Sequence, residues 1–280
     1  QLFSTIQFPV PNKYRLPKKY SLKDYQLQCI ENIENRFSKN NNIAAFVMES
    51  GAQMAGGVII YPKGFQKKIR QLCKKYDVLF VLDEIATGFG RLGSMIQYEE
   101  QKSIPDISAF GKMLTGGYLT MAATLTNKKV FDSFSGEFND WKHLFHGHTY
   151  TGNPIAAAVA NENLKMYQKN NLIKKIQKTS KIFTKFYQEI SEIDIVGDIR
   201  HKGMLMGIEL VTNKSKKTPI KPKKSINKIF FEEGKKQGIY LRTLGNIVML
   251  VPPLAISENE LNLLLNKTIK TIKSAKSQLI

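Results

Sequence analysis

The stretch VLFVLDEI, residues 78–85, decides the fold class. Five apolar residues in succession and then two acids form a continuous pattern, which is typical of a parallel strand buried on both faces. The preceding stretch FQKKIRQLCKKYD (65–77) has helical spacing, and the stretch IAAFVMES (43–50) before it is another short apolar run. This order of strand, helix and strand predicts an α/β fold with a mostly parallel sheet covered on both faces.

Further elements extend this pattern on both sides. DISAF (106–110) and TMAATLTN (120–127) predict a third and a fourth strand, and SLKDYQLQCIENIENRFSKN (21–40) predicts a helix that begins at a serine. We therefore expect residues 1–153 to form part of a large domain that is built around this sheet.

The composition of the sequence changes at Pro154, where an alanine-rich helix is predicted to begin. The stretch NLIKKIQKTSKIFTKFYQEI (171–190) has the spacing of one amphipathic helix with a solvated polar face. Further strand patterns and a closing helix from Ser257 complete the chain. Residues 154–280 are expected to form a smaller α+β domain.

The composition describes a soluble globular protein. Of the 280 residues, 42% are hydrophobic and 23% are charged, which suits an ample core. No apolar run approaches the roughly 20 residues that span a bilayer, and residues 1–20 lack the apolar core of a signal peptide. Cys29 and Cys73 are too few for a disulfide framework or a zinc site. We expect a cytoplasmic protein with no metal and no membrane partner.

The net charge of +19 raises the question of nucleic-acid binding. The densest basic run, TNKSKKTPIKPKKS (212–225), contains no aromatic residue on which a base would stack. Lysines are otherwise spread along helical patterns, as on solvated helix faces. No nucleic-acid partner is therefore predicted, and acidic ligands remain an open alternative.

Polar residues follow three of the predicted strands: Glu49, the pair Asp83–Glu84, and Lys112. In a parallel α/β sheet, ligands bind beyond the carboxyl ends of the strands. Alone, Asp83 fits a helix cap or a metal ligand, and Lys112 fits a phosphate-binding lysine. Together, a lysine and an aspartate are the two groups that pyridoxal phosphate requires of a protein. The lysine must lose a proton to attack an aldehyde, so we expect it to be partly desolvated.

Three linked motifs narrow this interpretation: VLDEIATGFGRLG (81–93), PDISAFGKMLTGG (105–117) and HGHTYTGNPIAAA (146–158). In this order and spacing they resemble the class III (omega-type) aminotransferases, which are fold-type I pyridoxal-phosphate enzymes. The resemblance extends from IAAFVMESGAQMAGG (43–57) to LVPPLAI (250–256), nearly the whole chain. It implies an aminotransferase with pyridoxal 5'-phosphate as cofactor.

The resemblance also assigns roles to single residues. It implies that Lys112 forms the Schiff base with the cofactor and acts as acid and base, and that Asp83 pairs with the pyridine nitrogen. Ile85 is expected to pack on a ring face. Thr149 is expected to hydrogen-bond the cofactor phosphate across the interface of a homodimer, while His146 and His148 shape the interface loop.

Within the family, Ala86 in DEIATGFGR replaces the glutamine that several branches carry, and resembles the biotin-pathway branch. That branch converts 8-amino-7-oxononanoate to 7,8-diaminononanoate, with S-adenosylmethionine or, in some members, lysine as the amino donor. The resemblance places Arg242 on the substrate carboxylate, and Gly147 is assigned with it to the substrate site. A strand-edge surface arginine remains the alternative for Arg242.

Two departures from the family pattern stand out. The family has an N-terminal portion with a glycine–serine turn for the cofactor phosphate, and residues 1–42 contain no counterpart, so we expect a chain that lacks this portion. Ser50 follows Glu49 where Glu-Pro is more usual. Another class III omega-aminotransferase, a racemase or decarboxylase of the same fold, a nucleic-acid-binding protein and an inactive fragment remain alternatives.

Overall fold

The computed structural model describes residues 4–40, 42–221 and 225–280. The chain divides into two compact units, and each is described by itself. The first unit comprises Gln1–Ala52, Tyr61–Phe89 and Ile96–Met166, and the second comprises Gln53–Ile60, Gly90–Met95 and Tyr167–Ile280. This division differs from the predicted boundary after residue 153, because most of helix α5 (Pro154–Lys169) belongs to the first unit.

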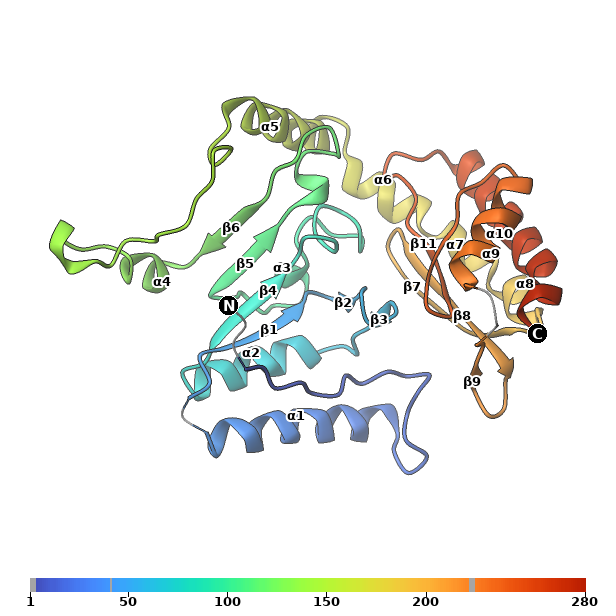
Figure 1. Cartoon of the computed structure of the whole chain (residues 1–280), viewed down its shortest axis with the longest axis horizontal. Helices are drawn as coiled ribbons and strands as arrows, with labels where there is room; N and C mark the ends of the chain where they lie inside the picture. The colour runs from blue at the N-terminus through green and yellow to red at the C-terminus, as the bar shows by residue number, and fades with distance from the viewer. Residues whose placement is uncertain (1–3, 41, 222–224) are drawn as a thin grey trace. The chain divides into compact units, whose positions relative to one another are not determined.

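The first unit is built on a four-stranded sheet with the order β1-β4-β5-β6 (Figure 1). Its strands are β1 (Ala45–Glu49), β4 (Leu79–Asp83), β5 (Ile107–Phe110) and β6 (Ala123–Thr126). β1, β4 and β5 are parallel, and β6 runs antiparallel to β5. The predicted α/β fold with a mostly parallel sheet is confirmed.

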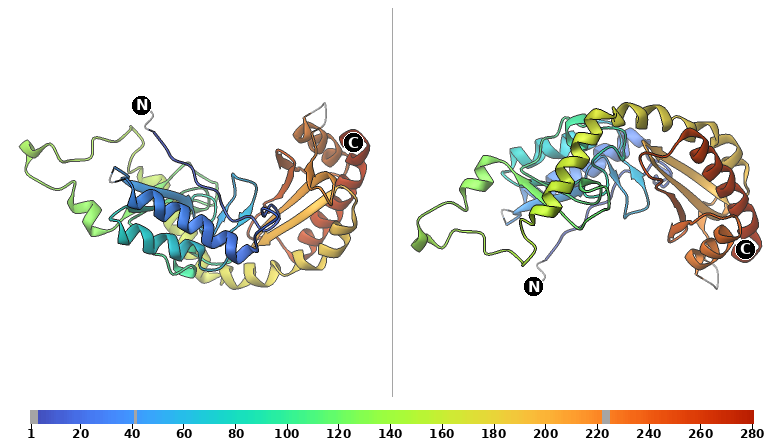
Figure 2. Two further views of the ribbon diagram at one scale, coloured as in Figure 1. Left: turned by 90° about the horizontal axis from the view of Figure 1, so that it is seen from below. Right: turned by 90° about the horizontal axis from the view of Figure 1, so that it is seen from above.

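Two helices, α1 (Leu22–Ser38) and α2 (Phe65–Lys75), lie side by side in the first unit (Figure 2). Ser21 caps α1, because its hydroxyl accepts a hydrogen bond from the backbone N–H of Asp24 at 3.2 Å. The two helices share one core with the central strand. Its most buried members are Cys29, Ile33, Ile69, Cys73, Phe80 and Leu82.

One strand of the first unit is less buried than the sequence suggested. β1 pairs only with β4 in the described sheet, and its Val47 side chain is 67% exposed. The prediction of a strand within residues 43–50 is confirmed, but the prediction that this strand is buried is wrong. An edge strand is covered on fewer sides than a central one.

The remaining elements of the first unit are short. They are α3 (Gln97–Glu100), the 3₁₀ turn η1 (Lys112–Leu114), α4 (Lys128–Asp132) and the 3₁₀ turn η2 (Phe138–Asp140). Two short strands, β2 (Ala52–Gln53) and β3 (Ile59–Ile60), interrupt the loop between β1 and α2, and β3 belongs to the second unit. None of the described helices is both long and apolar enough to cross a lipid bilayer.

The second unit contains an antiparallel sheet with the order β10-β11-β8-β7, and β9 pairs with the far end of β8. These strands are β7 (Val196–Lys202), β8 (Leu205–Asn213), β9 (Thr218–Pro219), β10 (Arg242–Leu244) and β11 (Ile247–Leu250). Helices α9 (Ile226–Lys236) and α10 (Glu258–Leu279) pack against each other (Figure 1). Ser257 caps α10 in a capping box with Glu260, as the predicted start of the last helix requires.

The predicted single helix over residues 171–190 is wrong. The structure divides it into α6 (Leu172–Thr179), α7 (Ile182–Lys185) and α8 (Tyr187–Glu192). Near the first break, the Ser180 hydroxyl donates to the Gln177 carbonyl at 3.0 Å. Hydroxyl side chains that bond to nearby carbonyls compete with the helical ladder, so the apolar spacing alone did not ensure one continuous helix.

Candidate active site

Asp83 is the last residue of β4 and lies between the two neighbouring strands, opposite Glu49 of β1 and Ala109 of β5. Its Oδ1 accepts a hydrogen bond from the backbone N–H of Ile85 at 2.8 Å. An aspartate that bonds the backbone two residues ahead stabilises the turn that follows it. The half-buried carboxylate is thereby held at the carboxyl end of the sheet, where the sequence predicted a ligand site.

Lys112 lies two residues beyond β5 and begins the turn η1. Its φ angle is 43°, in the left-handed region that few residues other than glycine adopt. Such backbone strain persists where the surrounding structure enforces it and is found often at functional sites. The side chain is exposed, so the predicted partial desolvation is not found. Residues 116–120, which follow this turn, are exposed as well, so this part of the surface is open.

The turn after Lys112 is locked by the first unit. Gly116 and Gly117 have φ angles of 63° and 88°, which favour glycine at both positions. Asn163 of α5 donates through Nδ2 to the carbonyls of Met113 and Leu114, at 2.7 and 3.1 Å. These bonds fix the backbone from which the Lys112 side chain extends.

Ile85 lies against the backbone that leads to Lys112. A Cβ atom added to Gly111 would lie 3.3 Å from the Ile85 Cγ2, so a larger residue at this position would press on Ile85. The structure therefore brings together Asp83, Ile85 and Lys112 at the ends of β4 and β5. An amine, a carboxylate and an apolar side chain in one cluster suit the aldehyde, the ring nitrogen and the ring face of pyridoxal phosphate.

Gly147 and Thr149 are not gathered into this cluster. They lie in what we call the exposed segment, residues 131–150, in which every residue is exposed. Its hydrogen bonds among the described residues join neighbours in the sequence, as between the backbone N–H of His148 and Thr151 Oγ1 at 3.0 Å. In Figures 1 and 2 this segment leaves the sheet beyond β6.

Arg242, the predicted substrate ligand, belongs to the second unit. It is the first residue of β10, opposite Met249 of β11, and its side chain is exposed. Arg91, from the TGFGRLG part of the motif, has a different function in that unit. Its Nη1 donates to the carbonyls of Met204 and Pro252 at 2.8 and 2.7 Å, and burial lowers the pKa of its guanidinium to about 10.

The sequence analysis named Glu84 and Ser50 without giving either a role beside the Asp83 backbone, and it did not name Gln66. Glu84, Ser50 and Gln66 are fully buried polar side chains in the first unit, and burial raises the pKa of the Glu84 carboxyl above its ordinary value. Strand alternation was the available signal, because it places the Asp83 and Glu84 side chains on opposite faces of the sheet.

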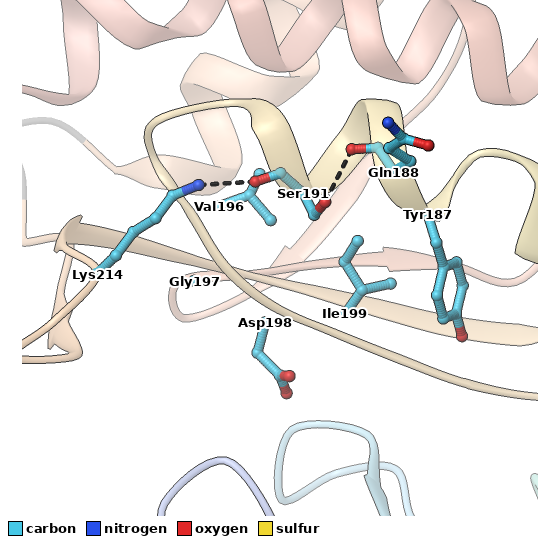
Figure 3. Close-up of a pocket in the computed structure, with 8 residues that line it drawn as sticks. All are labelled: Tyr187, Gln188, Ser191, Val196, Gly197, Asp198, Ile199 and Lys214. Carbon is cyan, nitrogen blue, oxygen red and sulfur yellow. Dashed lines mark hydrogen bonds between the residues drawn. The ribbon is translucent and has the colours of Figure 1, made fainter.

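The second unit has a surface groove between α8 and β7 (Figure 3). Lys214 Nζ donates to the Ser191 carbonyl at 2.7 Å, while the Asp198 side chain points away from that bond. Burial raises the pKa of Tyr187, which also lines the groove, to about 12. The groove contains none of the predicted site residues, so it is separate from the candidate active site.

Comparison with known proteins agrees with the chemistry of this cluster. Residues 2–272 match the family model described as Aminotransferase class-III. The chain belongs to this family. Members of the family depend on pyridoxal phosphate, so the resemblance noted from the motifs and the cofactor class that it implied are confirmed.

Individual members give the same picture. The chain is 39% identical over 278 residues to the adenosylmethionine-8-amino-7-oxononanoate aminotransferase of Aquifex aeolicus, covering 99% of this chain and 61% of that protein. A crystal structure of the Methanocaldococcus jannaschii enzyme of the same name matches with a TM-score of 0.85 and 39% identity, over 89% of this chain and 58% of that one.

An omega transaminase from Pseudomonas jessenii, solved in complex with PMP, matches with a TM-score of 0.89 and 29% identity, over 96% of this chain and 60% of that one. The chain thus spans about three fifths of the length of these relatives.

Proposed function

We propose that the chain carries the cofactor-binding lysine and aspartate of an aminotransferase that converts 8-amino-7-oxononanoate to 7,8-diaminononanoate in biotin biosynthesis. The observation that carries this proposal is the cluster of Asp83, Ile85 and Lys112 at the strand ends, in a member of a pyridoxal-phosphate family. The names of the Aquifex and Methanocaldococcus relatives supply the substrate class.

Pyridoxal phosphate, when bound, supplies an aldehyde that takes up amines and a ring that accepts electrons from the substrate carbon. Lys112 Nζ would hold the cofactor aldehyde and would also move a proton at the substrate carbon as general base and acid. The Asp83 carboxylate would pair with the ring nitrogen, and the Ile85 N–H holds that carboxylate in place. The Ile85 side chain would cover a ring face and exclude water there.

Three further residues have proposed roles. The Thr149 hydroxyl would donate to the cofactor phosphate, and the Arg242 guanidinium would bind the substrate carboxylate. Gly147 lines the substrate site. These three roles rest on the family pattern, with S-adenosylmethionine or lysine as the amino donor. The cytoplasm stays the predicted compartment.

We also propose a homodimer. The exposed segment carries large apolar side chains, with Phe138 81% and Trp141 70% exposed. Exposed apolar patches of this kind mark protein–protein contact sites. Thr149 belongs to the same segment, which suits a phosphate ligand that acts in the partner's site.

The proposal is tested by mixing the purified chain with pyridoxal phosphate and recording its visible absorbance. Borohydride reduction followed by peptide mass spectrometry is expected to find the cofactor covalently attached to Lys112. Attachment to other lysines alone, or no saturable band, would contradict the proposed site.

The substrate is tested next, with 8-amino-7-oxononanoate and with S-adenosylmethionine, lysine or alanine as donor. Conversion with S-adenosylmethionine or lysine is expected. Transfer from alanine to a different keto acid would favour another class III omega-aminotransferase, as the Pseudomonas jessenii similarity allows. A chain that binds the cofactor but transfers no amino group would be an inactive fragment.

A further inference from the structure

A buried hydrogen-bond network lies next to Asp83 on the far side of its strand. Its centre is Glu84, whose side chain is fully buried. The Glu84 carboxylate accepts the backbone N–H of Gln97 at 2.9 Å through Oε2 and that of Tyr98 at 2.7 Å through Oε1, and it also bonds the Ser50 side chain. Both oxygens are therefore used, as only a carboxylate allows.

The network continues through Ser50 into the core. Gln66 Nε2 donates to Ser50 Oγ at 3.0 Å and to Ser103 Oγ at 2.9 Å, and Gln66 Oε1 accepts the backbone N–H of Gly51 at 2.7 Å. Ser50 and Gln66 are fully buried, and Ser103 is nearly so. Buried polar networks in which every member is bonded are rigid, because each lost bond would leave an unsatisfied group.

Backbone bonds from Ser50 of this network and from Ala109 of β5 hold the peptide group between Asp83 and Glu84 on both sides. The Asp83 carbonyl accepts the backbone N–H of Ser50 at 2.9 Å, and the Glu84 N–H donates to the Ala109 carbonyl at 2.9 Å. These two bonds fix one peptide plane between β1 and β5. Because the Asp83 side chain leaves the chain next to this plane, its direction follows the orientation of the plane.

We propose that Glu84 is a positioning residue for Asp83: with Ser50 and Gln66 it fixes the 83–84 peptide plane and thereby aims the Asp83 carboxylate at the cofactor's ring nitrogen. The proposal rests on the proposed function for the identity of the ring. A serine at position 50 contributes two links, a backbone N–H and a hydroxyl, and a proline would supply neither.

The test compares Glu84→Gln with Glu99→Gln, the same change at an exposed glutamate of α3. The glutamine at 84 has one acceptor oxygen for two backbone N–H groups, so at least one bond is lost. In the chain without cofactor, hydrogen exchange at the Ser50, Gln97 and Tyr98 amides is expected to be about 10-fold faster in Glu84→Gln and unchanged in Glu99→Gln.

With pyridoxal phosphate added, two further changes are expected for Glu84→Gln. The cofactor binds about 10-fold more weakly, and the pH midpoint of the visible band moves upward. The direction follows because a ring nitrogen kept positive by Asp83 makes the nitrogen bonded to Lys112 easier to deprotonate. Asp83→Asn, as a reference, is expected to move the midpoint the same way and further.

The outcomes separate the two proposals. Absence of a band in the wild-type chain contradicts the proposed function, while the exchange measurement still tests the network. Unchanged hydrogen exchange at the Ser50 amide in Glu84→Gln overturns the positioning role. The role is also overturned if Glu84→Gln changes the temperature of unfolding but leaves the pH midpoint of the visible band unchanged. If Glu84→Gln does not fold, Ser50→Ala keeps the carboxylate and is expected to give the same shifts at smaller size.

Discussion

Two parts of the first unit carry predicted cofactor contacts, and they differ in almost every physical respect. The strand ends around Asp83 and Lys112 are fixed by backbone pairing, by Asn163 and by the buried network of Glu84. The exposed segment that carries Thr149 has large apolar side chains at the surface. The hydrogen bonds described for this segment join residues that are close together in the sequence.

The difference indicates which part of the proposed site is formed within a single chain. At the strand ends, the geometry needs no other molecule, because every element that fixes it lies in the first unit. Apolar side chains such as Trp141 gain free energy only when they are covered. The phosphate-binding half is therefore expected to be completed by assembly, and the following experiments test that contrast.

The largest effect is expected for Lys112→Ala. Removing the amine abolishes the visible cofactor band, and loss of the proton-transfer role alone lowers turnover by about 10²–10⁴-fold. Absorbance and single-turnover assays measure both. Lys102→Ala is the matched control, since Lys102 is exposed and has a similar φ of 52°. If the visible band persists in Lys112→Ala, the strand ends do not hold the cofactor through Lys112.

A second prediction concerns the support of the strand ends. Asp106 accepts bonds from Arg70, the Phe80 N–H and Asn127 Nδ2 at 2.7–3.2 Å, which joins α2 to both flanks of β5. Asp106→Ala is expected to lower the free energy of unfolding by about 3 kcal/mol, because it leaves buried donors unpaired.

Urea unfolding measures this loss. Asp132→Ala, which breaks an exposed pair with Lys128, is the control and is expected to cost far less. Equal losses in the two variants would mean that Asp106 does not support the sheet.

A third prediction tests the exposed segment. Trp141→Glu is expected to weaken self-association about 30-fold, since a central aromatic contact contributes roughly 2 kcal/mol to an interface. Sedimentation velocity over a concentration series measures the dissociation constant. Phe231→Glu changes an exposed aromatic of α9 instead, and should leave association unchanged. If both variants associate like the wild type, the segment is not the interface.

The smallest effect is a pH dependence in the second unit. Burial beside Phe183 lowers the pKa of His201 below its ordinary value of 6.5, although its contact with the Gly203 carbonyl opposes this in part. The unfolded chain then binds the proton first, so the free energy of unfolding is full above pH 6.5 and falls as the pH drops below it.

His201→Gln is expected to reduce this loss, as measured by urea midpoints between about pH 5 and 8. Tyr187, which packs against the same ring, stays neutral in that range because its pKa is raised to about 12. This measurement also shows whether a loss of cofactor signal at low pH comes from unfolding of the second unit. An equal pH dependence in both proteins would assign the effect to other groups.

Much of the first unit follows from local patterns. The continuous apolar run of β4, the helical spacing of α2 and the cap at Ser21 predicted elements that the structure contains. The placement of Asp83 and Lys112 beyond strand ends followed from the same reasoning. Strand β7, in contrast, was missed, because its sequence VGDIRHK carries the mixed polarity of a half-buried edge.

The sequence by itself determined the order of the main strands and helices of the first unit, the family, and the pair of residues that suits its cofactor, because these follow from short local patterns. Only the tertiary structure decided that β1 is an edge, that residues 171–190 form three helices, and that Lys112 is exposed. It also decided that Glu84 meets Gln97 and that Gln66 meets Ser103, 37 residues away. Such contacts depend on how distant segments close on each other, which no local periodicity encodes.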